Sequence, residues 1–290
     1  MPQTHNEKIQ ELWADKIRFM SMLKGGVIFC VYNQAQAKIC ERVGAKALIS
    51  VDSGYLHDND GEASEGFRMA DPGITQDIMD SVALPVFGRV RVGHEMEAKI
   101  THHLGASGVH EYDMTMTAAD EGSHILKKPY KIPFICAASD LGEALRRISE
   151  GASMIHTKGG DIEHTPNIVS TMLEINVIND QIKAAVSKAN KKDDLIAFAE
   201  EIEAPCVLLE QVARLEKLPV PFFGYGGVGQ PTDAAYIMSQ KCDGVIINAN
   251  VLAGVDTQRR ALAMVMATEN PTNYEIIAKV SENLDIPPID

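Results

Sequence analysis

Short runs of apolar and β-branched residues alternate with amphipathic segments along most of the chain. The runs have the length and composition of buried strands, and the segments between them carry apolar residues at the three- and four-residue spacing of helices. The expected strands are residues 27–31, 47–51, 86–91, 108–112, 134–138, 154–157, 220–224 and 245–248. The clearest expected helices are residues 33–43, 74–82, 95–104, 141–150 and 233–240.

Helix-start signals support this pattern. Asp71 followed by Pro72 predicts an N-cap with proline in the first turn, and Thr232 precedes an acidic first turn. About eight strand–helix units follow one another without a linker or a break in composition. The sequence therefore predicts an α/β protein with a single (β/α)8 TIM barrel over residues 1–290. A doubly wound open sheet is the alternative, but its G-x-G-x-x-G fingerprint is absent after the first strand.

Three segments exceed a minimal barrel. Residues 7–23 form an extra amphipathic helix within an N-terminal segment, residues 1–24. Residues 52–69 form a long, polar loop after the second strand, and loops of that length are usually functional. Residues 166–217 are mostly helical and enlarge the sixth crossover into a helical insertion.

Composition narrows the class of protein. The 290 residues are 45% hydrophobic and carry 27 Lys and Arg against 40 Asp and Glu, a net charge of −13. That charge disfavours nucleic acid and acidic membrane surfaces as partners. The five scattered cysteines form no C-x-x-C pair, and no apolar run reaches membrane-span length. We expect a soluble cytoplasmic protein without a metal site or a resident cofactor.

Side chains at the carboxyl ends of barrel strands face the active site. The expected strands place there Cys30, Arg89, Arg91, His110, Glu111, Ser139, His156, Lys158, Gly226 and Asn248.

Seven short motifs recur in the order found in one enzyme family. They are K-G-G-V-I at residues 24–28, R-M-A-D-P at 68–72, R-V-G-H at 91–94, D-L-G-E-A-L-R-R-I at 140–148, E-G-A-S-M at 150–154, T-K-G at 157–159 and G-G-V at 226–228. Together they resemble the synthase subunit of the glutamine-dependent pyridoxal 5′-phosphate synthase, over residues 8–284. The resemblance implies synthesis of vitamin B6 from two sugar phosphates and ammonia, two imine-forming lysines, a separate glutaminase subunit, and hexamers or dodecamers.

Only some of the functional residues that the resemblance implies have a match in this chain. Lys158 matches the second imine lysine. Phosphate contacts are implied for Arg146, Arg147 and His124 at one site, and for the glycine turn Gly226 and Gly227 after the seventh strand.

Other positions depart from the family. Arg89 stands where the first imine lysine belongs, and Cys30 and His110 replace two aspartates. The glycine-rich loop after T-K-G becomes the acidic segment 159–167, and a Gly-Ser pair at the eighth strand becomes Asn248 followed by alanine. Because a guanidinium stays charged, Arg89 cannot form the ordinary imine (Schiff base).

These departures leave several interpretations open. Arg89 either binds an anion or forms a structural ion pair with a carboxylate such as Glu111. Cys30 and His110 either form a thiolate–imidazole pair, or a metal site with His156, or fill the barrel as inert polar groups, which we favour. We predict a divergent, catalytically impaired family member, a pseudoenzyme with a structural or regulatory role beside an active paralogue or a glutaminase subunit. The alternatives are aldolase- or lyase-like chemistry on a sugar phosphate through Lys158, and a synthase that is still active.

Overall fold

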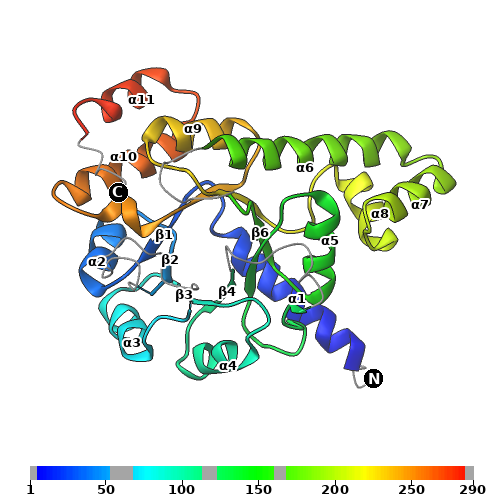
Figure 1. Cartoon of the computed structure of the whole chain (residues 1–290), viewed down its shortest axis with the longest axis horizontal. Coiled ribbons are helices and arrows are strands. Elements are labelled where there is room, and N and C mark those ends of the chain that lie inside the picture. The colour runs from blue at the N-terminus through cyan, green and yellow to red at the C-terminus, as the bar shows by residue number, and fades with distance from the viewer. Residues whose placement is uncertain (1–4, 53–67, 113–122, 160–167, 285–290) are drawn as a thin grey trace, which may run out of the picture.

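The computed structural model describes residues 5–52, 68–112, 123–159 and 168–284. Eight parallel strands pair in chain order, and β1 also pairs with β8, so the sheet closes into a barrel (Figure 1). The strands are β1 (Val27–Val31), β2 (Ala47–Ser50), β3 (Val86–Val90), β4 (Gly108–Glu111), β5 (Phe134–Ala137), β6 (Met154–His156), β7 (Phe222–Tyr225) and β8 (Gly244–Ile247). The predicted TIM barrel is confirmed, and the helices around it are α2 (Gln34–Arg42), α3 (Pro72–Ser81), α4 (Glu95–His103), α5 (Leu141–Glu150), α9 (Pro231–Ser239), α10 (Thr257–Glu269) and α11 (Tyr274–Ser281).

Alternation along each strand separates two apolar layers. Ile28, Phe87 and Phe223 belong to a buried cluster inside the barrel, whereas Phe29 and Val90 belong to the larger cluster between strands and helices. A shift of one residue along a strand therefore moves a side chain from the lumen to the outer layer. This alternation decides which polar residues can meet.

Helix starts agree with the sequence in one case and not in another. The side chain of Asp71 accepts a hydrogen bond from the Gly73 amide and caps α3, as predicted. The predicted start at Thr232 is wrong, because α9 begins at Pro231 with Gln230 as its N-cap. There the carboxylate of Asp233 folds back onto the Gly229 and Gln230 amides, so the capping bonds lie two residues earlier than expected.

The fourth crossover differs from the predicted strand–helix alternation. Between β4 and β5, the described residues 112 and 123–133 contain no α-helix. The segment instead runs extended against the barrel, with Ile125 and Lys127 buried. The amides of Lys127 and Lys128 both donate to the carbonyl of Glu150 at the end of α5. Hydrogen bonds to a neighbouring helix thus replace those that a helix would have made internally.

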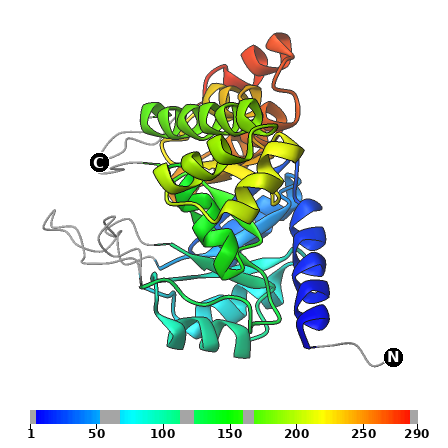
Figure 2. The same cartoon turned by 90° about the vertical axis from the view of Figure 1, so that its right-hand side faces the viewer.

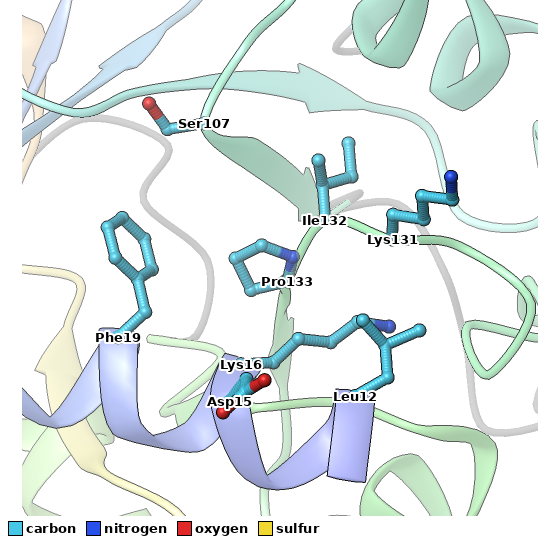
Figure 3. Close-up of a pocket in the computed structure, with 8 residues that line it drawn as sticks. All are labelled: Leu12, Asp15, Lys16, Phe19, Ser107, Lys131, Ile132 and Pro133. Carbon is cyan, nitrogen blue, oxygen red and sulfur yellow. The ribbon is translucent and has the colours of Figure 1, made fainter. Parts of the chain in front are cut away.

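The extra helix at the N-terminus is confirmed. Helix α1 (His5–Ser21) lies along one side of the barrel (Figure 2), where Met20 is buried in the lumen cluster. A pocket of about 350 Å³ separates α1 from Ser107 and Pro133, which precede β4 and β5 (Figure 3). This pocket therefore opens at the amino ends of the strands. Burial lowers the pKa of Lys16, which lines it, to about 8.

The enlarged sixth crossover is also confirmed. It contains α6 (Ile168–Lys188), α7 (Lys192–Glu201) and α8 (Cys206–Leu215), and the long α6 is prominent in Figure 1. Thr171, in the first turn of α6, donates from its hydroxyl toward the carbonyls of Tyr225 and Gly226. The start of α6 is thereby fixed against the carboxyl end of β7. Within the described part of the chain, no helix has the length and hydropathy needed to cross a bilayer.

Candidate functional site

Arg89 lies in the lumen near the carboxyl ends of the strands and is only 2% exposed. One terminal nitrogen, Nη2, donates to the Tyr225 hydroxyl at 3.0 Å and to Cys30 Sγ at 3.3 Å. Nε donates to His110 Nδ1 at 3.4 Å. The strands β1, β3, β4 and β7 therefore converge on one guanidinium.

The hydrogen bonds continue from His110 in a fixed direction. His156 Nδ1 lies 2.6 Å from the Thr157 carbonyl oxygen, which can only accept, so this nitrogen carries the proton. In a neutral imidazole, His156 Nε2 is then an acceptor. It accepts a hydrogen bond from the N–H group at His110 Nε2, with 2.8 Å between the two nitrogens. His110 Nδ1 is left with a lone pair, which accepts from Arg89.

Burial keeps both imidazoles neutral. It lowers the pKa of His156 to about 3, with a further contribution from the Arg89 charge. Burial, followed by the charges of Arg89 and His156, also lowers the pKa of His110 well below its usual range. Two tyrosines complete the cluster. The Arg89 guanidinium lies 5.3 Å from the Tyr112 ring centre and 5.9 Å from that of Tyr225.

These contacts bear on the roles considered for Cys30 and His110. Both ring nitrogens of His110 and of His156 are engaged in the chain, so no lone pair is left for a metal, and the described residues contain no metal-binding cluster. Burial raises the pKa of the Cys30 thiol despite the nearby guanidinium. The favoured interpretation, that Cys30 and His110 fill the barrel as inert polar groups, stays a prediction.

The expected ion pair between Arg89 and Glu111 is wrong. Adjacent strand residues point to opposite faces, so Glu111 lies outside the barrel while His110 lies inside. Glu111 pairs with Lys127 at 2.7 Å, and both side chains are fully buried. Although burial alone would raise it, the nearby His124 and the charge of Lys127 lower the pKa of Glu111 to about 2. Glu111 also accepts from the Gly93 amide, and so organises the outer layer.

The three residues suggested for a second phosphate site have internal partners. His124 Nδ1 lies 3.6 Å from Glu111 Oε1. Arg147, 2% exposed, pairs with Glu150 at 2.8 Å, and Glu150 also pairs with Lys127. His124 and Arg147 therefore belong to one network of charges.

Arg146 lies apart from that network. It donates to the carbonyls of Ile202 and Glu203, between α7 and α8. Arg91 was likewise expected at the barrel mouth, but it turns outward to pair with Glu97 at 2.8 Å, in the first turn of α4.

Lys158 lies beyond the end of β6 and is 32% exposed. Its ammonium pairs with Glu143 of α5 at 2.6 Å. The other Glu143 oxygen accepts from both the amide and the hydroxyl of Ser139. Burial alone would raise the pKa of Glu143, but the charge of Lys158 and these hydrogen bonds lower it. The carboxylate therefore stays ionised beside the ammonium.

Glycines pack closely where β6 and β7 end. Gly159, Gly226 and Gly227 all have positive φ. A Cβ at Gly159 would lie 2.7 Å from the Gly226 Cα, so no side chain fits between the two turns. Asn248 begins a short 3-10 helix, Ala249–Leu252, at the neighbouring strand end.

The sequence prediction missed several residues of this region. Tyr112 and Tyr225 follow from the same alternation that places His110 and Phe223 inside, but the predicted seventh strand stopped at residue 224. Glu174 also reaches the barrel mouth, where it accepts from the Gly159 amide at 3.1 Å. It lies in the helical insertion, where no pattern in the sequence marks it.

Comparison with known proteins agrees with the resemblance seen in the motifs. A model of the SOR/SNZ family matches residues 13–225. A probable pyridoxal 5′-phosphate synthase subunit from Dictyostelium discoideum is 41% identical over 273 residues, covering 93% of this chain and 86% of the relative. The pyridoxal 5′-phosphate synthase subunit PdxS from Thermotoga maritima is 40% identical over 277 residues, covering 95% and 92%. On these matches, the chain belongs to the SOR/SNZ family and is a relative of the PdxS subunits of pyridoxal 5′-phosphate synthase.

Proposed function

We propose that this chain is a divergent, catalytically impaired member of its family, with a structural or regulatory role in vitamin B6 biosynthesis. The observation that carries this proposal is the burial of Arg89, whose guanidinium donates hydrogen bonds to Cys30, His110 and Tyr225. An imine needs a neutral primary amine, and a guanidinium cannot supply one. At the position that resembles the first imine lysine, the side chain is a filler of the lumen.

The proposed assembly is a homo-oligomeric ring, hexameric or dodecameric, built from single-barrel domains spanning residues 1–290. Support comes from α6, where Val169, Leu173 and Val177 follow one another at four-residue spacing and are 57%, 59% and 43% exposed. Aligned apolar side chains on one helix face are typical of an interface. A glutaminase subunit or an active paralogue is the further partner that we propose, by analogy with the relatives, which are synthase subunits.

One specific observation favours a second function. The ammonium of Lys158 is 32% exposed, so it can meet a carbonyl compound at the barrel mouth. Aldolase- or lyase-like chemistry on a sugar phosphate would use this amine, with its proton passing to Glu143 at 2.6 Å. A synthase that is still active would have to use this amine alone.

We also propose that the chain binds a sugar phosphate or an inorganic anion at Arg146, Arg147 and His124, with the turn at Gly226 and Gly227 as the other phosphate position. The pairing of Arg147 with Glu150 means that an anion must compete with a carboxylate there. We therefore expect weak binding.

Imine trapping tests the proposal. The protein is incubated with ribose 5-phosphate and reduced with borohydride, and the mass of the intact protein is then measured by mass spectrometry. Lys158→Arg is the matched control. An adduct absent from the control supports chemistry at Lys158, and no adduct supports the impaired subunit.

A turnover assay complements the trapping experiment. Glutaminase subunit, glutamine and both sugar phosphates are added, and the absorbance of the product, pyridoxal 5′-phosphate, is followed. We expect no product, and multiple turnovers would overturn the proposal.

A further inference from the structure

The carboxylate of Glu174 lies against the backbone where β6 ends. Its Oε2 accepts a hydrogen bond from the Gly159 amide at 3.1 Å, and the backbone and charge of Lys158 lie close enough to lower the pKa of Glu174. Three residues earlier on the same face of α6, Thr171 contacts the carbonyls of Tyr225 and Gly226. These hydrogen bonds hold the start of α6 over the barrel mouth, and so place the Glu174 carboxylate against the backbone at the end of β6.

The groups around this carboxylate form a site for an oxyanion. The Gly159 amide points at the carboxylate with the Lys158 backbone beside it, and backbone N–H groups that line a concavity bind anions. The chain can approach closely because Gly159 carries no side chain, and a Cβ there would collide with Gly226. The ammonium of Lys158, attached to the same backbone, adds a positive charge. In this structure the bound anion is the protein's own side chain.

We propose that Glu174 is an intramolecular occupant of an oxyanion site formed by Lys158 and the Gly159 amide, and that protonation of Glu174 admits an external tetrahedral oxyanion. The geometry makes the two anions exclusive, since both need the same amides and the same ammonium. The contact is therefore autoinhibitory toward anion binding. This inference does not depend on the proposed function, because binding an anion requires no imine and no catalysis.

The charges that face Glu174 set the pH of this exchange. Lys158 contributes a positive charge, Glu143 of α5 a negative one, and the hydroxyl of Tyr112 lies near enough to be affected by the carboxylate. Burial is the largest influence and raises the pKa of Glu174 to about 7, against the two amide hydrogen bonds and Lys158, which lower it. Glu174 is thus neutral below pH 7 and charged above it.

Charge accounting gives the direction and size of the effect. At pH 8 an external anion meets the Glu174 carboxylate on the Gly159 amide and the Glu143 carboxylate on Lys158, whereas at pH 6 Glu174 is protonated. With a pKa of about 7, the protonated fraction of Glu174 rises from ~0.1 at pH 8 to ~0.9 at pH 6. Anion binding that requires the protonated form should therefore tighten by roughly tenfold over this range.

Sulfate is the appropriate probe because it stays a dianion between pH 6 and pH 8, unlike phosphate. Its affinity is measured by calorimetry at both pH values for the full-length protein, for Glu174→Gln and for Lys158→Met. We expect the wild type to bind sulfate about tenfold more tightly at pH 6. Glu174→Gln should bind sulfate at pH 8 as tightly as the wild type does at pH 6. In Lys158→Met, the difference in sulfate affinity between pH 6 and pH 8 should disappear.

A matched control removes a charge from the same helix without touching the site. Asp180, on α6, is exposed and forms an i,i+3 ion pair with Lys183, so Asp180→Asn should behave as the wild type. Equal sulfate affinity of the wild type at pH 6 and pH 8 would overturn the proposal without any variant. It would also fail if Glu174→Gln kept the full wild-type pH dependence.

Discussion

Arg89→Lys tests whether Arg89 is a filler of the lumen or a replaceable imine position. Two nitrogens of the guanidinium donate hydrogen bonds to Tyr225, Cys30 and His110, among other contacts of this side chain. An ammonium is a single compact donor and cannot reach both the Tyr225 hydroxyl and His110 Nδ1 from one position. The substitution keeps the positive charge and removes the planar guanidinium with its several N–H donors.

The magnitude follows from the group left without a partner. His110 Nδ1 is buried and has its lone pair fixed by the chain through His156, so it cannot switch tautomer to compensate. An orphaned buried acceptor costs about 1–3 kcal/mol, and the lost contact of the flat guanidinium with two tyrosine rings costs about 1 kcal/mol. The sum is about 2–4 kcal/mol, or a fall in melting temperature of roughly 4–8 °C for a chain of this size.

The assay is thermal unfolding together with the turnover measurement. Arg91→Lys is the matched control, because Arg91 follows the same strand but is 42% exposed and pairs with Glu97 at the surface. We expect it to change the melting temperature by no more than ~2 °C, since exposed ion pairs contribute little. We expect no synthase activity from Arg89→Lys, because Cys30 and His110 remain. A variant as stable as the wild type, or one with full activity, would refute the reasoning.

Three further predictions follow from other parts of the molecule. Glu111→Gln should lose about 3 kcal/mol in urea unfolding, because it leaves Lys127 short of a buried partner. Since the folded pKa of Glu111 is about 2, the wild-type advantage should persist above pH ~4.5 and shrink as the pH falls toward 2; a pH-independent difference would contradict this. Lys16→Met should raise stability at pH 7 by about 1–2 kcal/mol by removing a desolvated ammonium, and the gain should fade between pH 8 and ~10.4, where the folded wild type has already released its proton. In native mass spectrometry at micromolar concentration we expect a ring oligomer, and a spectrum of monomer alone would count against the proposed assembly.

Much of the barrel could be predicted from sequence because strands and helices differ in apolar period. The same period placed Cys30, Arg89 and His110 among the residues at the carboxyl ends of the strands, and in the structure Arg89 contacts the other two. Lys158 was also placed correctly beyond the end of β6. These predictions need only the alternation of side chains and the parallel arrangement of the strands.

Other features depend on contacts between distant segments. The pairing of Glu111 with Lys127 required knowing that residues 123–133 return along the outer layer without a helix. The position of Glu174 required knowing that α6 starts over the barrel mouth, which Thr171 fixes through the β7 carbonyls. Arg147 looked available for an anion because sequence does not show that Glu150 already pairs with it.

The part of the fourth crossover that the structure describes, residues 112 and 123–133, contains no α-helix, and this has a consequence for the kinetics of folding. Its described part gains its hydrogen bonds from Glu150, later in the chain, and its buried charge pair from Glu111, earlier in the chain. An extended segment with no internal hydrogen-bond ladder cannot form ahead of the elements that hold it, so it should dock after the folding barrier is crossed. Substitutions such as Ile125→Ala should then accelerate unfolding and leave the refolding rate almost unchanged. The contacts of residues 123–133 would then help to set the unfolding rate, and so the lifetime of the native state, while contributing little to the folding rate.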